Sequence, residues 1–290
     1  MQLGLVGLGR MGGNMRERIR EAGHEVVGYD RNPDISDAAS LEELVSKLSA
    51  PRVVWTMVPA GPITEGTIDQ LADLLSEGDL IIDGGNSKFT DDQVHDVMLR
   101  EKGIGYIDAG VSGGVWGLEN GYALMVGGEA SSVEMAMPIF EALKPQGPYG
   151  FVHAGPVGAG HYAKMVHNGI EYGMMQAFAE GYELLAASEY VDNVPGIIKS
   201  WREGSVVKSW LLDLLDLALD GDPKLAQLKG YAEDTGEGRW TVDEAVRLAV
   251  PLHVIASSLF ARFESRQPDS PAMKAVAALR QQFGGHAVHA

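Results

Sequence analysis

The glycine-rich turn Gly7-Leu8-Gly9-Arg10-Met11-Gly12 follows a short apolar run, residues 3–6, and opens a helical pattern over 12–22. A G-x-G-x-x-G motif is informative when a strand precedes it and a helix follows it, and both patterns are present here. Its glycines then allow a tight turn, a close approach of the backbone to a pyrophosphate, and close packing of helix on strand, while the helix N-terminus offers N–H groups to phosphate. The turn predicts a dinucleotide site formed by Gly7, Leu8, Gly9, Arg10, Met11 and Gly12.

An acidic residue follows the second apolar run, at the distance that a dinucleotide site requires. Val26-Val27-Gly28-Tyr29 leads into Asp30, about 20 residues beyond the glycine motif. A carboxylate there binds the ribose hydroxyls of the adenosine half and repels a 2′-phosphate, so Asp30 favours NAD over NADP. The neighbouring Arg31 can pair with a 2′-phosphate, which keeps NADP as a second cofactor.

Short apolar runs alternate with helical patterns through the first half of the chain. After residues 3–6, the expected strands are 26–30, 53–58, 80–83, 105–107 and 123–126, and the helical patterns are 12–22, 64–77, 90–102 and 131–143. The runs are continuously apolar, which is typical of strands covered on both faces. This order predicts a Rossmann-type, doubly wound parallel sheet with helices on both sides.

The pattern changes near residue 150. The segment 149–160 carries four glycines and a proline around one more apolar run, which indicates a last strand and then a domain boundary. Beyond it lie a long helical pattern, 161–190, and further helical patterns at 194–203, 206–219, 241–250, 252–265 and 270–283. We therefore predict an α/β fold with a cofactor-binding domain at 1–156 and an all-helical domain at 157–290 that begins with a long helix.

The composition limits the partners. The chain has 290 residues, 23 Lys and Arg against 40 Asp and Glu, a formal charge of −17, and no cysteine. An acidic surface makes nucleic acid and anionic membranes poor partners, and the missing cysteines exclude disulfides and thiolate chemistry. No basic leader is visible, and no apolar run reaches the ~18 residues of a membrane helix. We expect a cytoplasmic protein that holds any anionic ligand with a local cluster of cations.

The long helical pattern at 161–190 is apolar on most of its circumference, which indicates a buried helix. Lys164, Asn168 and Glu171 nevertheless recur at i, i+4 and i+7, so they share one face, with His167 and Tyr172 beside it. An unpaired buried charge is costly. The Lys and the Glu therefore either pair on a solvated edge or face a cleft as an acid and a base, and the apolar surroundings favour the second interpretation.

Two further polar turns follow expected strands. Ser112-Gly113-Gly114 offers a hydroxyl and exposed N–H groups that suit a carboxylate or hydroxyl of substrate, although the same residues also suit an ordinary loop. Asp83-Gly84-Gly85-Asn86-Ser87 lies at the carboxyl end of the strand 80–83, where open α/β sheets bind ligands. Asn86 either contacts substrate, or caps the following helix, or does both.

Together these motifs resemble the 6-phosphogluconate dehydrogenases, a family within the β-hydroxyacid dehydrogenase superfamily. The resemblance rests on GLGRMGGN (7–14), DGGNS (83–87), VSGG (111–114), GAGHYAKMVHNGIEYGMMQ (158–176), GEGRWT (236–241) and FARF (260–263). HNGIEYG (167–173) is the most specific string, because the wider superfamily shares the glycine turn, the SGG turn and the lysine without it. The similarity spans nearly the whole chain and is to the short form of the family.

The resemblance implies oxidative decarboxylation of 6-phosphogluconate to ribulose 5-phosphate and CO2 with reduction of NAD. Lys164 is then the general base for the C3 hydroxyl, and Glu171 is the general acid that protonates C1. The sugar acid would be held by Asn86, Ser112, Gly113, Gly114, His167 and Asn168, and the cofactor site would include Val58, Pro59, Ala60 and Asn86. The keto acid intermediate is already activated for loss of CO2, so no metal is implied.

The resemblance also implies a cationic phosphate site and a partner subunit. The phosphate ligands would be Tyr172, Arg239, Arg262, Arg280 and His286. In this family the tail that carries Arg280 and His286 reaches the neighbouring subunit's site, so we expect a homodimer or a homotetramer. Family members that use NADP commonly have Asn-Arg where this chain has Asp30-Arg31, which again favours NAD.

Two other functions fit part of the pattern. One is a different β-hydroxyacid dehydrogenase, such as a 3-hydroxyisobutyrate-type enzyme with an unphosphorylated substrate. The cations Arg239, Arg262, Arg280 and His286 argue against it. The other is a non-catalytic NAD sensor, and the presence of both Lys164 and Glu171 argues against that.

Overall fold

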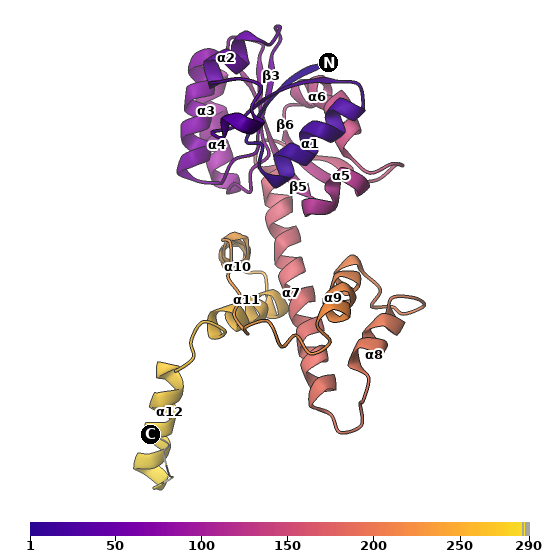
Figure 1. Ribbon diagram of the computed structural model, residues 1–290. Coiled ribbons are helices and arrows are strands. Elements are labelled where there is room, and N and C mark those ends of the chain that lie inside the picture. The colour runs from indigo at the N-terminus through magenta and orange to yellow at the C-terminus, as the bar shows by residue number, and fades with distance from the viewer. Residues whose placement is uncertain (286, 288–290) are drawn as a thin grey trace. The chain divides into compact units, whose positions relative to one another are not determined.

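The chain divides between Val166 and His167 into two compact units in the computed structural model, which describes residues 1–285 and 287 (Figure 1). The division lies inside the helix α7 (Ala159–Ala187), because the first two turns of this helix pack with the residues before it. Residue 156, after which the sequence analysis places the domain boundary, directly follows the last strand, and that boundary stays a prediction. His286, a predicted phosphate ligand, lies outside the described residues.

The first unit contains a seven-stranded sheet with the order β2-β1-β3-β4-β5-β6-β7. The strands are β1 (Gln2–Val6), β2 (Glu25–Tyr29), β3 (Val53–Thr56), β4 (Leu80–Asp83), β5 (Gly105–Ser112), β6 (Ala123–Gly128) and β7 (Phe151–Gly155). The pairs from β2 to β5 are parallel, and helices follow the strands, so the predicted fold class is confirmed. The strand order reverses between β1 and β3, and doubly wound sheets bind ligands at the carboxyl ends of such strands.

One end of the sheet departs from the parallel arrangement. β6 pairs antiparallel with β5, and β7 pairs parallel with β6. A parallel crossover needs a dozen or more residues, usually including a full helix. The chain between β5 and β6 holds only η2 (Gly114–Trp116) and α5 (Gly117–Asn120), so it turns back beside β5. The connection to β7 contains α6 (Ala130–Leu143), which is long enough for a parallel return.

Helices cover both faces of the sheet (Figure 1). On one face α1 (Arg10–Glu21) and α6 bury Met15, Ile19 and Phe140 against the strands. On the other face lie α2 (Leu41–Ser46), α3 (Pro62–Leu74) and α4 (Phe89–Glu101), which bury Leu44 and Leu71. Full burial of such a side chain contributes about 1.5–3 kcal/mol, so the two layers supply the main stabilisation of this unit.

The short helix α2 is an element that the sequence analysis did not predict. The Ser40 hydroxyl accepts a hydrogen bond from the Glu43 N–H at 3.2 Å, and the Glu43 carboxylate accepts one from the Ala39 N–H at 2.7 Å. This reciprocal arrangement is a capping box, which Ser40 and Glu43 encode at the spacing S-x-x-E. The helix is only a turn and a half long, so its apolar periodicity is too short to detect.

The second unit is all-helical, as predicted. It contains the rest of α7 and α8 (Val194–Trp201), α9 (Trp210–Gly221), α10 (Glu237–Leu248), α11 (His253–Glu264) and α12 (Pro271–Gly284). Ile198, Leu212 and Leu219 form its small core, against which Phe178 of α7 packs. α10 and α11 approach α7 at Gly169, where a Cβ would lie 2.9 Å from Cγ2 of Thr241. Among the described residues, no helix is both long enough and apolar enough to cross a membrane.

The expectation that α7 is buried around its whole circumference is wrong for its second part. Ile170 is 51% exposed and Leu184 is 74% exposed. The helices of a single chain cover only some sides of α7, so apolar side chains on the other sides remain in contact with solvent. An apolar residue at the surface is ordinary when it is single, but several on one helix indicate a surface that another molecule covers.

Candidate cofactor and active site

The turn between β1 and α1 has the shape that the glycine motif predicts. Gly7 has φ +89°, and a Cβ there would lie 2.5 Å from the carbonyl oxygen of Met57. A Cβ on Gly12 would lie 1.9 Å from the carbonyl oxygen of Gly7, so α1 packs directly on the turn. No atom of residues 1–285 or 287 lies within 4 Å of a Cβ built on Gly9, so the backbone there is open to a ligand.

The N-terminus of α1 is the anion-binding part of this turn. Gly9 is the N-cap residue and supplies no side-chain cap, and the first turn contains no acidic residue. The first N–H groups of a helix lack partners inside the helix, and its dipole favours negative charge there. Arg10 adds an exposed cation at the first helical position. A pyrophosphate fits this arrangement.

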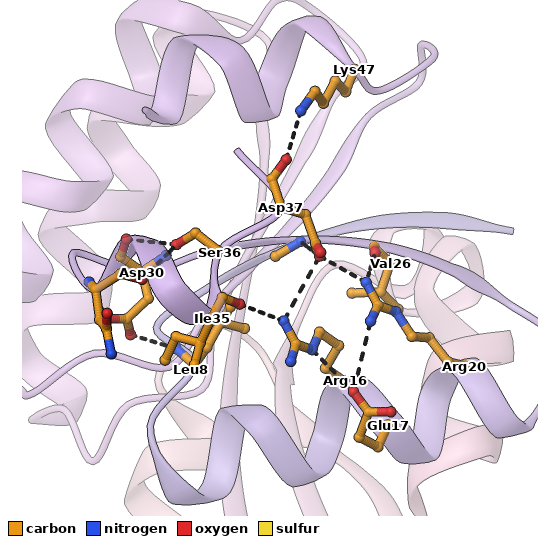
Figure 2. A network of polar contacts seen from close by, with 12 residues as sticks. Leu8, Arg16, Glu17, Arg20, Val26, Asp30, Ile35, Ser36, Asp37 and Lys47 are labelled. Carbon is orange, nitrogen blue, oxygen red and sulfur yellow. Dashed lines mark hydrogen bonds and ion pairs between the residues drawn. The ribbon is translucent and has the colours of Figure 1, made fainter. Parts of the chain in front are cut away.

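Asp30 lies at the end of β2 and contacts the glycine turn directly (Figure 2). One of its carboxylate oxygens accepts a hydrogen bond from the Leu8 N–H at 2.8 Å, and the other accepts one from the Asn32 N–H at 2.9 Å. The structure thus brings together Asp30 and the turn at 7–12, as the dinucleotide prediction requires. Arg31 is exposed beside them.

The loop after Asp30 is held to α1 by a network that the sequence analysis missed. Figure 2 shows Asp37 between the end of β2 and α1, where it accepts hydrogen bonds from Arg20 at 2.7 Å and from the Gly28 N–H at 2.8 Å. Arg16 donates to the carbonyl oxygen of Ile35 at 2.7 Å. These contacts fix the loop that lies beside Asp30. The sequence does show two arginines, Arg16 and Arg20, one turn apart on α1, and this spacing could have indicated a shared acidic partner.

The predicted residues after β3 and β4 lie around the same turn. Val58 has its Cγ1 3.1 Å from a Cβ built on Gly7 and its carbonyl oxygen 3.1 Å from a Cβ built on Gly85. Pro59, Ala60 and Asn86 follow in these loops, and Ala60 and Asn86 are exposed. Asn86 is not the N-cap of α4: Lys88 is, without a side-chain cap, so capping does not explain Asn86.

Ser112, Gly113 and Gly114 follow β5 and enter η2. Gly113 has φ +147° and Gly114 has φ +53°, conformations that favour glycine. Within the described part of the chain nothing lies within 4 Å of a Cβ built on Gly114, so this turn also presents open backbone. Asn14 of α1 donates to the carbonyl oxygen of Val115 at 3.2 Å, which ties the turn to the helix that the glycine motif begins.

Lys164 lies in the second turn of α7, and its side chain packs against β5. It is only 9% exposed. A Cβ built on Gly110 of β5 would lie 2.5 Å from Cβ of Lys164, so the helix and the strand are in close contact at this point. The sequence analysis expected this lysine either on a solvated edge or in a cleft. In the structure it is nearly buried, and the glycine opposite it is the local reason why the lysine can approach the sheet.

A buried polar cluster that the sequence analysis did not identify surrounds the start of α7. His161 Nδ1 lies 2.9 Å from Asp92 Oδ2, and both side chains are buried. Burial, partly offset by the charge of His161, raises the pKa of Asp92 to about 6. Burial lowers the pKa of His161, but the charge and hydrogen bond of Asp92 outweigh it and, with Asp83 and Asp108, raise that pKa to about 9. The pair is therefore ionic near neutral pH.

The same cluster holds a group of potential metal ligands. Asp83, Asp92 and His161 offer ligand atoms within 4.8 Å of one another. These atoms already have protein partners: Asp92 pairs with His161, and the Asp83 carboxylate accepts from the Gly85 N–H at 2.9 Å and from the Ser87 hydroxyl at 2.8 Å. The two carboxylates are thus engaged by donors of the protein itself.

In the second unit, the predicted residues on α7 form a local group. His167 Nδ1 lies 3.2 Å from the Asn168 side-chain oxygen and 3.9 Å from a carboxylate oxygen of Glu171. Asn168 is nearly buried, whereas the Glu171 side chain is 40% exposed. A carboxylate with this exposure beside an imidazole can exchange protons with solvent or with a ligand.

The predicted phosphate ligands are only partly brought together. The Arg262 guanidinium lies 3.5 Å from the centre of the Tyr172 ring, and the Tyr172 hydroxyl accepts from the Thr235 N–H at 3.3 Å. Arg239 pairs with Asp234, a buried carboxylate that also pairs with Arg266 at 2.9 Å. The hydrogen bond from Arg239 lowers the pKa of Asp234.

Arg280 lies on α12 and is not brought to this group. The helix α12 has no buried residue, and within residues 1–285 and 287 Arg280 makes no hydrogen bond or ion pair. The structure therefore gathers Tyr172 and Arg262, holds Arg239 on Asp234, and leaves Arg280 apart.

Comparison with known proteins identifies the family. Residues 2–147 match the model of the NAD binding domain of 6-phosphogluconate dehydrogenase, and residues 160–287 match that of the 6-phosphogluconate dehydrogenase C-terminal domain. YqeC of Bacillus subtilis is 42% identical over 296 residues, with 99% of each chain covered. The NAD(+)-dependent, decarboxylating 6-phosphogluconate dehydrogenase of Haloferax volcanii is 40% identical over 299 residues, which covers 99% of this chain and 98% of that protein. The chain spans 61% of the NAD(+)-dependent, decarboxylating enzyme of Bacillus subtilis, with 36% identity.

Comparison with solved structures gives the same family. Plasmodium falciparum 6-phosphogluconate dehydrogenase, studied apo, with NADP+ and with 6-phosphogluconate, matches all of this chain and 66% of its own, with a TM-score of 0.85 and 27% identity. Mycobacterium tuberculosis 3-hydroxyisobutyrate dehydrogenase matches with a TM-score of 0.70 and 24% identity over 96% of this chain and 99% of its own, which shows a shared fold. The two family models together cover most of the chain, and it belongs to the 6-phosphogluconate dehydrogenase family.

Proposed function

We propose that the protein oxidatively decarboxylates 6-phosphogluconate to ribulose 5-phosphate and CO2 with NAD as the oxidant. The observation that carries this proposal is Lys164, a nearly buried amine on a helix that also bears Glu171 seven residues later. Family membership supports the substrate, and the names of the Haloferax and Bacillus relatives support NAD. We further propose residues 1–156 as the cofactor domain and 157–290 as the domain for substrate and subunit contacts.

The reaction begins at the C3 hydroxyl of the sugar acid. Bound NAD supplies a hydride acceptor. Lys164, in its neutral form, takes the hydroxyl proton as C3 loses its hydride, so the amine acts as a general base. A general base must lie beside the proton that it takes, and Lys164 lies nearly buried against β5.

The resulting 3-keto acid loses CO2, and negative charge develops on the C3 oxygen. Lys164 now carries the proton that it removed, so its ammonium stabilises this oxyanion. Glu171 donates a proton to C2 of the sugar acid, which becomes C1 of ribulose 5-phosphate. Its carboxylate is partly exposed and lies beside His167, so it can regain a proton for the next turnover.

The substrate contacts follow from the polar turns and α7. Asn86, Ser112, Gly113, Gly114, His167 and Asn168 hold the sugar acid. Tyr172, Arg239, Arg262, Arg280 and His286 bind its phosphate. Arg262, stacked on Tyr172, presents a guanidinium with a fixed plane, which suits bidentate binding of phosphate oxygens.

The cofactor preference depends on Asp30. Its carboxylate is fixed by the N–H groups of Leu8 and Asn32 beside the turn that binds pyrophosphate. A fixed negative charge there accepts ribose hydroxyls and repels a 2′-phosphate, so NAD is preferred and NADP is used less well. Val58, Pro59, Ala60 and Asn86 complete the site, with Arg31 beside Asp30.

The mechanism requires no metal ion. The keto group formed at C3 accepts the electron pair that stays on C2 when the bond to the departing CO2 breaks, and Lys164 supplies the positive charge that would otherwise come from a Lewis acid. The carboxylates of Asp83 and Asp92 already accept hydrogen bonds from protein donors, and the donor to Asp92 is His161, as described above. Turnover after treatment with a chelator should therefore equal turnover before it.

The active unit is a homodimer or a homotetramer that acts in the cytoplasm, where NAD and sugar phosphates are found. Apolar side chains on α7 and α12 are exposed in the single chain, among them Ile170, Met273, Leu279 and Phe283. A second copy that covers these side chains would also bring Arg280 of α12 to a neighbouring phosphate site. Sedimentation equilibrium measures the mass of this assembly.

Absorbance of reduced nicotinamide tests the proposal directly. The protein is mixed with 6-phosphogluconate and either NAD or NADP, and CO2 is assayed in the same samples. Reduction of NAD with stoichiometric CO2 is the expected result. Reduction without CO2 would identify a plain hydroxyacid dehydrogenase, and binding of NAD without any reduction would contradict an enzymatic role. Lys164→Ala should abolish turnover and leave NAD binding intact.

A further inference from the structure

The first turn of α7 is capped by a carboxylate from the sheet. Asp108 lies on β5 and is buried. Its two oxygens accept hydrogen bonds from the Gly158 N–H at 2.7 Å and from the His161 N–H at 2.8 Å. A carboxylate at a helix N-terminus satisfies N–H groups that the helix leaves unpaired and complements the helix dipole. Asp108 therefore fixes where α7 begins relative to β5.

A second contact joins the same turn to α4. His161 Nδ1 lies 3.0 Å from Oδ1 and 2.9 Å from Oδ2 of Asp92. Its Nε2 has no hydrogen-bond partner among the described residues, so the polar contacts of the ring depend wholly on Asp92. Tyr106 of β5 donates to Asp92 at 3.0 Å, which orients the carboxylate. We call Asp92, His161 and Asp108 the α7 anchor.

The anchor lies one turn before Lys164. His161 and Lys164 are at i and i+3, so they are neighbours along the helix surface. The Cβ of Lys164 is in close contact with Gly110, two residues after Asp108 on β5. A shift of the first turn of α7 would therefore move the amine along the strand. Burial of a charged pair costs several kcal/mol of desolvation free energy per ion. Apolar residues would hold the helix to the sheet without this penalty, so stability alone does not explain the pair.

The cluster also reaches the loop that carries Asn86. The Tyr106 hydroxyl lies 3.4 Å from Asp83 Oδ2 as well as 3.0 Å from Asp92. Asp83 in turn holds the Gly85 N–H and the Ser87 hydroxyl on both sides of Asn86. The start of α7 and the loop 84–87 are thus connected through buried hydrogen bonds to the same strand.

We propose that Asp92 and His161 are positioning residues for Lys164: their buried ion pair fixes the first turn of α7 so that the lysine amine reaches the reacting hydroxyl. This inference rests on the proposed role of Lys164 as the base. The two residues do not touch substrate or cofactor; they act through the position of the helix.

The test uses the full chain with four variants. Asp92→Asn removes the charge at constant shape, His161→Gln removes the imidazole, and the double variant removes both. Tyr106→Phe removes a hydrogen bond to Asp92 and leaves the sequence of α7 unchanged. It replaces His161→Gln in the test if that variant does not fold. The matched control is His95→Gln. His95 is a second buried histidine, lies on α4 close to Tyr106, and makes no hydrogen bond with α7 in the described part of the chain.

Two readouts separate positioning from general stability. Each single variant should lower kcat about tenfold or more, because small displacements of a catalytic group have effects of this size, while the KM for NAD stays within about twofold of wild type. The double variant should be no slower than the slower single variant, since both residues act through one contact. The pH midpoint for labelling of Lys164 by an amine-specific reagent, followed by mass spectrometry, should shift in the anchor variants and not in His95→Gln.

The outcomes are distinct. A kcat in Asp92→Asn and His161→Gln equal to that of His95→Gln, with an unchanged labelling midpoint, would overturn the positioning role. Strictly additive losses of kcat in the double variant would overturn it as well. If the wild type does not oxidise 6-phosphogluconate, the proposed function fails, and the labelling of Lys164 still decides whether the anchor positions this amine.

Discussion

Gly110 of β5 and Lys164 of α7 are in such close contact that a Cβ on the glycine would lie 2.5 Å from Cβ of the lysine and 2.9 Å from the Gly160 carbonyl oxygen. We predict that the added methyl group in Gly110→Ala displaces the start of α7 away from β5. Overpacking of this kind costs about 1–3 kcal/mol, and the displaced amine should lower kcat about tenfold or more. Thermal unfolding and steady-state kinetics measure the two effects.

The control for this change is Gly181→Ala on the same helix. None of the residues that the structure describes has an atom within 4 Å of a Cβ built on Gly181. Alanine in a helix interior is favoured over glycine by about 0.5–1 kcal/mol, so this variant should be slightly more stable with an unchanged kcat. Equal kinetics in the two variants would contradict the close contact at Gly110.

Removal of the charge of Asp30 should relax the choice of cofactor. Asp30→Asn keeps one acceptor oxygen for the glycine turn and loses the repulsion of a 2′-phosphate. The ratio of kcat/KM for NAD to that for NADP should fall about tenfold, which corresponds to about 1.4 kcal/mol. Asp34→Asn, an exposed change in the same loop, should leave the ratio unchanged. A constant ratio in Asp30→Asn would remove this residue from cofactor selection.

The anchor predicts that the free energy of unfolding falls as the pH rises from 6.5 to about 9. The pKa of His161 is raised from 6.5 to about 9 in the folded state, mainly by Asp92 with help from Asp83 and Asp108. The folded protein therefore holds a proton that the unfolded chain releases in this range. The stabilisation is complete below 6.5, is lost as the pH passes about 9, and amounts to about 3 kcal/mol at most.

Urea unfolding of wild type and Asp92→Asn over that pH range checks this slope. Without the carboxylate, burial lowers the pKa of His161, so the decline between 6.5 and about 9 should be much smaller in the variant. Asp92 acts in the same direction at lower pH, since its pKa is raised from 3.8 to about 6. Parallel stability curves for the two proteins would show that the pair is not ionic.

Arg262→Gln should weaken binding of the substrate phosphate. The variant loses the guanidinium stacked on Tyr172 at 3.5 Å. Hydrogen bonds to charged groups contribute about 1.5–3 kcal/mol, so the KM for 6-phosphogluconate should rise roughly ten- to hundredfold while the KM for NAD stays constant. Lys208→Gln, which breaks an exposed ion pair with Glu203 in the same unit, is the control. A rise in both KM values would indicate a structural defect instead.

Glu171→Gln should block the last proton transfer. A positioned general acid contributes about 10²–10⁴-fold, so kcat should fall by that order. Exchange of the C1 proton of ribulose 5-phosphate with deuterated water, followed by NMR, reports this step alone and should cease in the variant. Glu180→Gln changes an exposed glutamate later on the same helix and should exchange normally. Normal exchange in Glu171→Gln would assign the proton to another group.

The elements that the sequence predicted are those with strong local patterns. β1, β4 and the helix α7 follow from continuous apolar runs and from a 3.6-residue period, and their local sequence determines them. The direction of β6 follows instead from the length of the connection before it, which an apolar pattern does not reveal. α2 was missed although Ser40 and Glu43 carry its capping signal.

The parts of the site that sequence analysis missed depend on contacts between distant residues. Asp92 and His161 are 69 residues apart, and a single sequence gives no sign that they pair. The same holds for Asp37 with Arg20 and for the sharing of Asp234 by Arg239 and Arg266. Motifs identify which residue types are present at a site, whereas their pairing is set by how the elements pack.

The continuity of α7 has a consequence for how the family's chains can change length. Lys164 and Glu171 are separated by seven residues of one helix, a rise of about 10 Å. One residue inserted between them would rotate Glu171 by about 100° away from the face of Lys164, and a deletion would rotate it the opposite way. Insertions elsewhere, in loops such as the one between α9 and α10, leave this spacing intact. We therefore expect gain and loss of residues among relatives to be confined to positions outside 164–171.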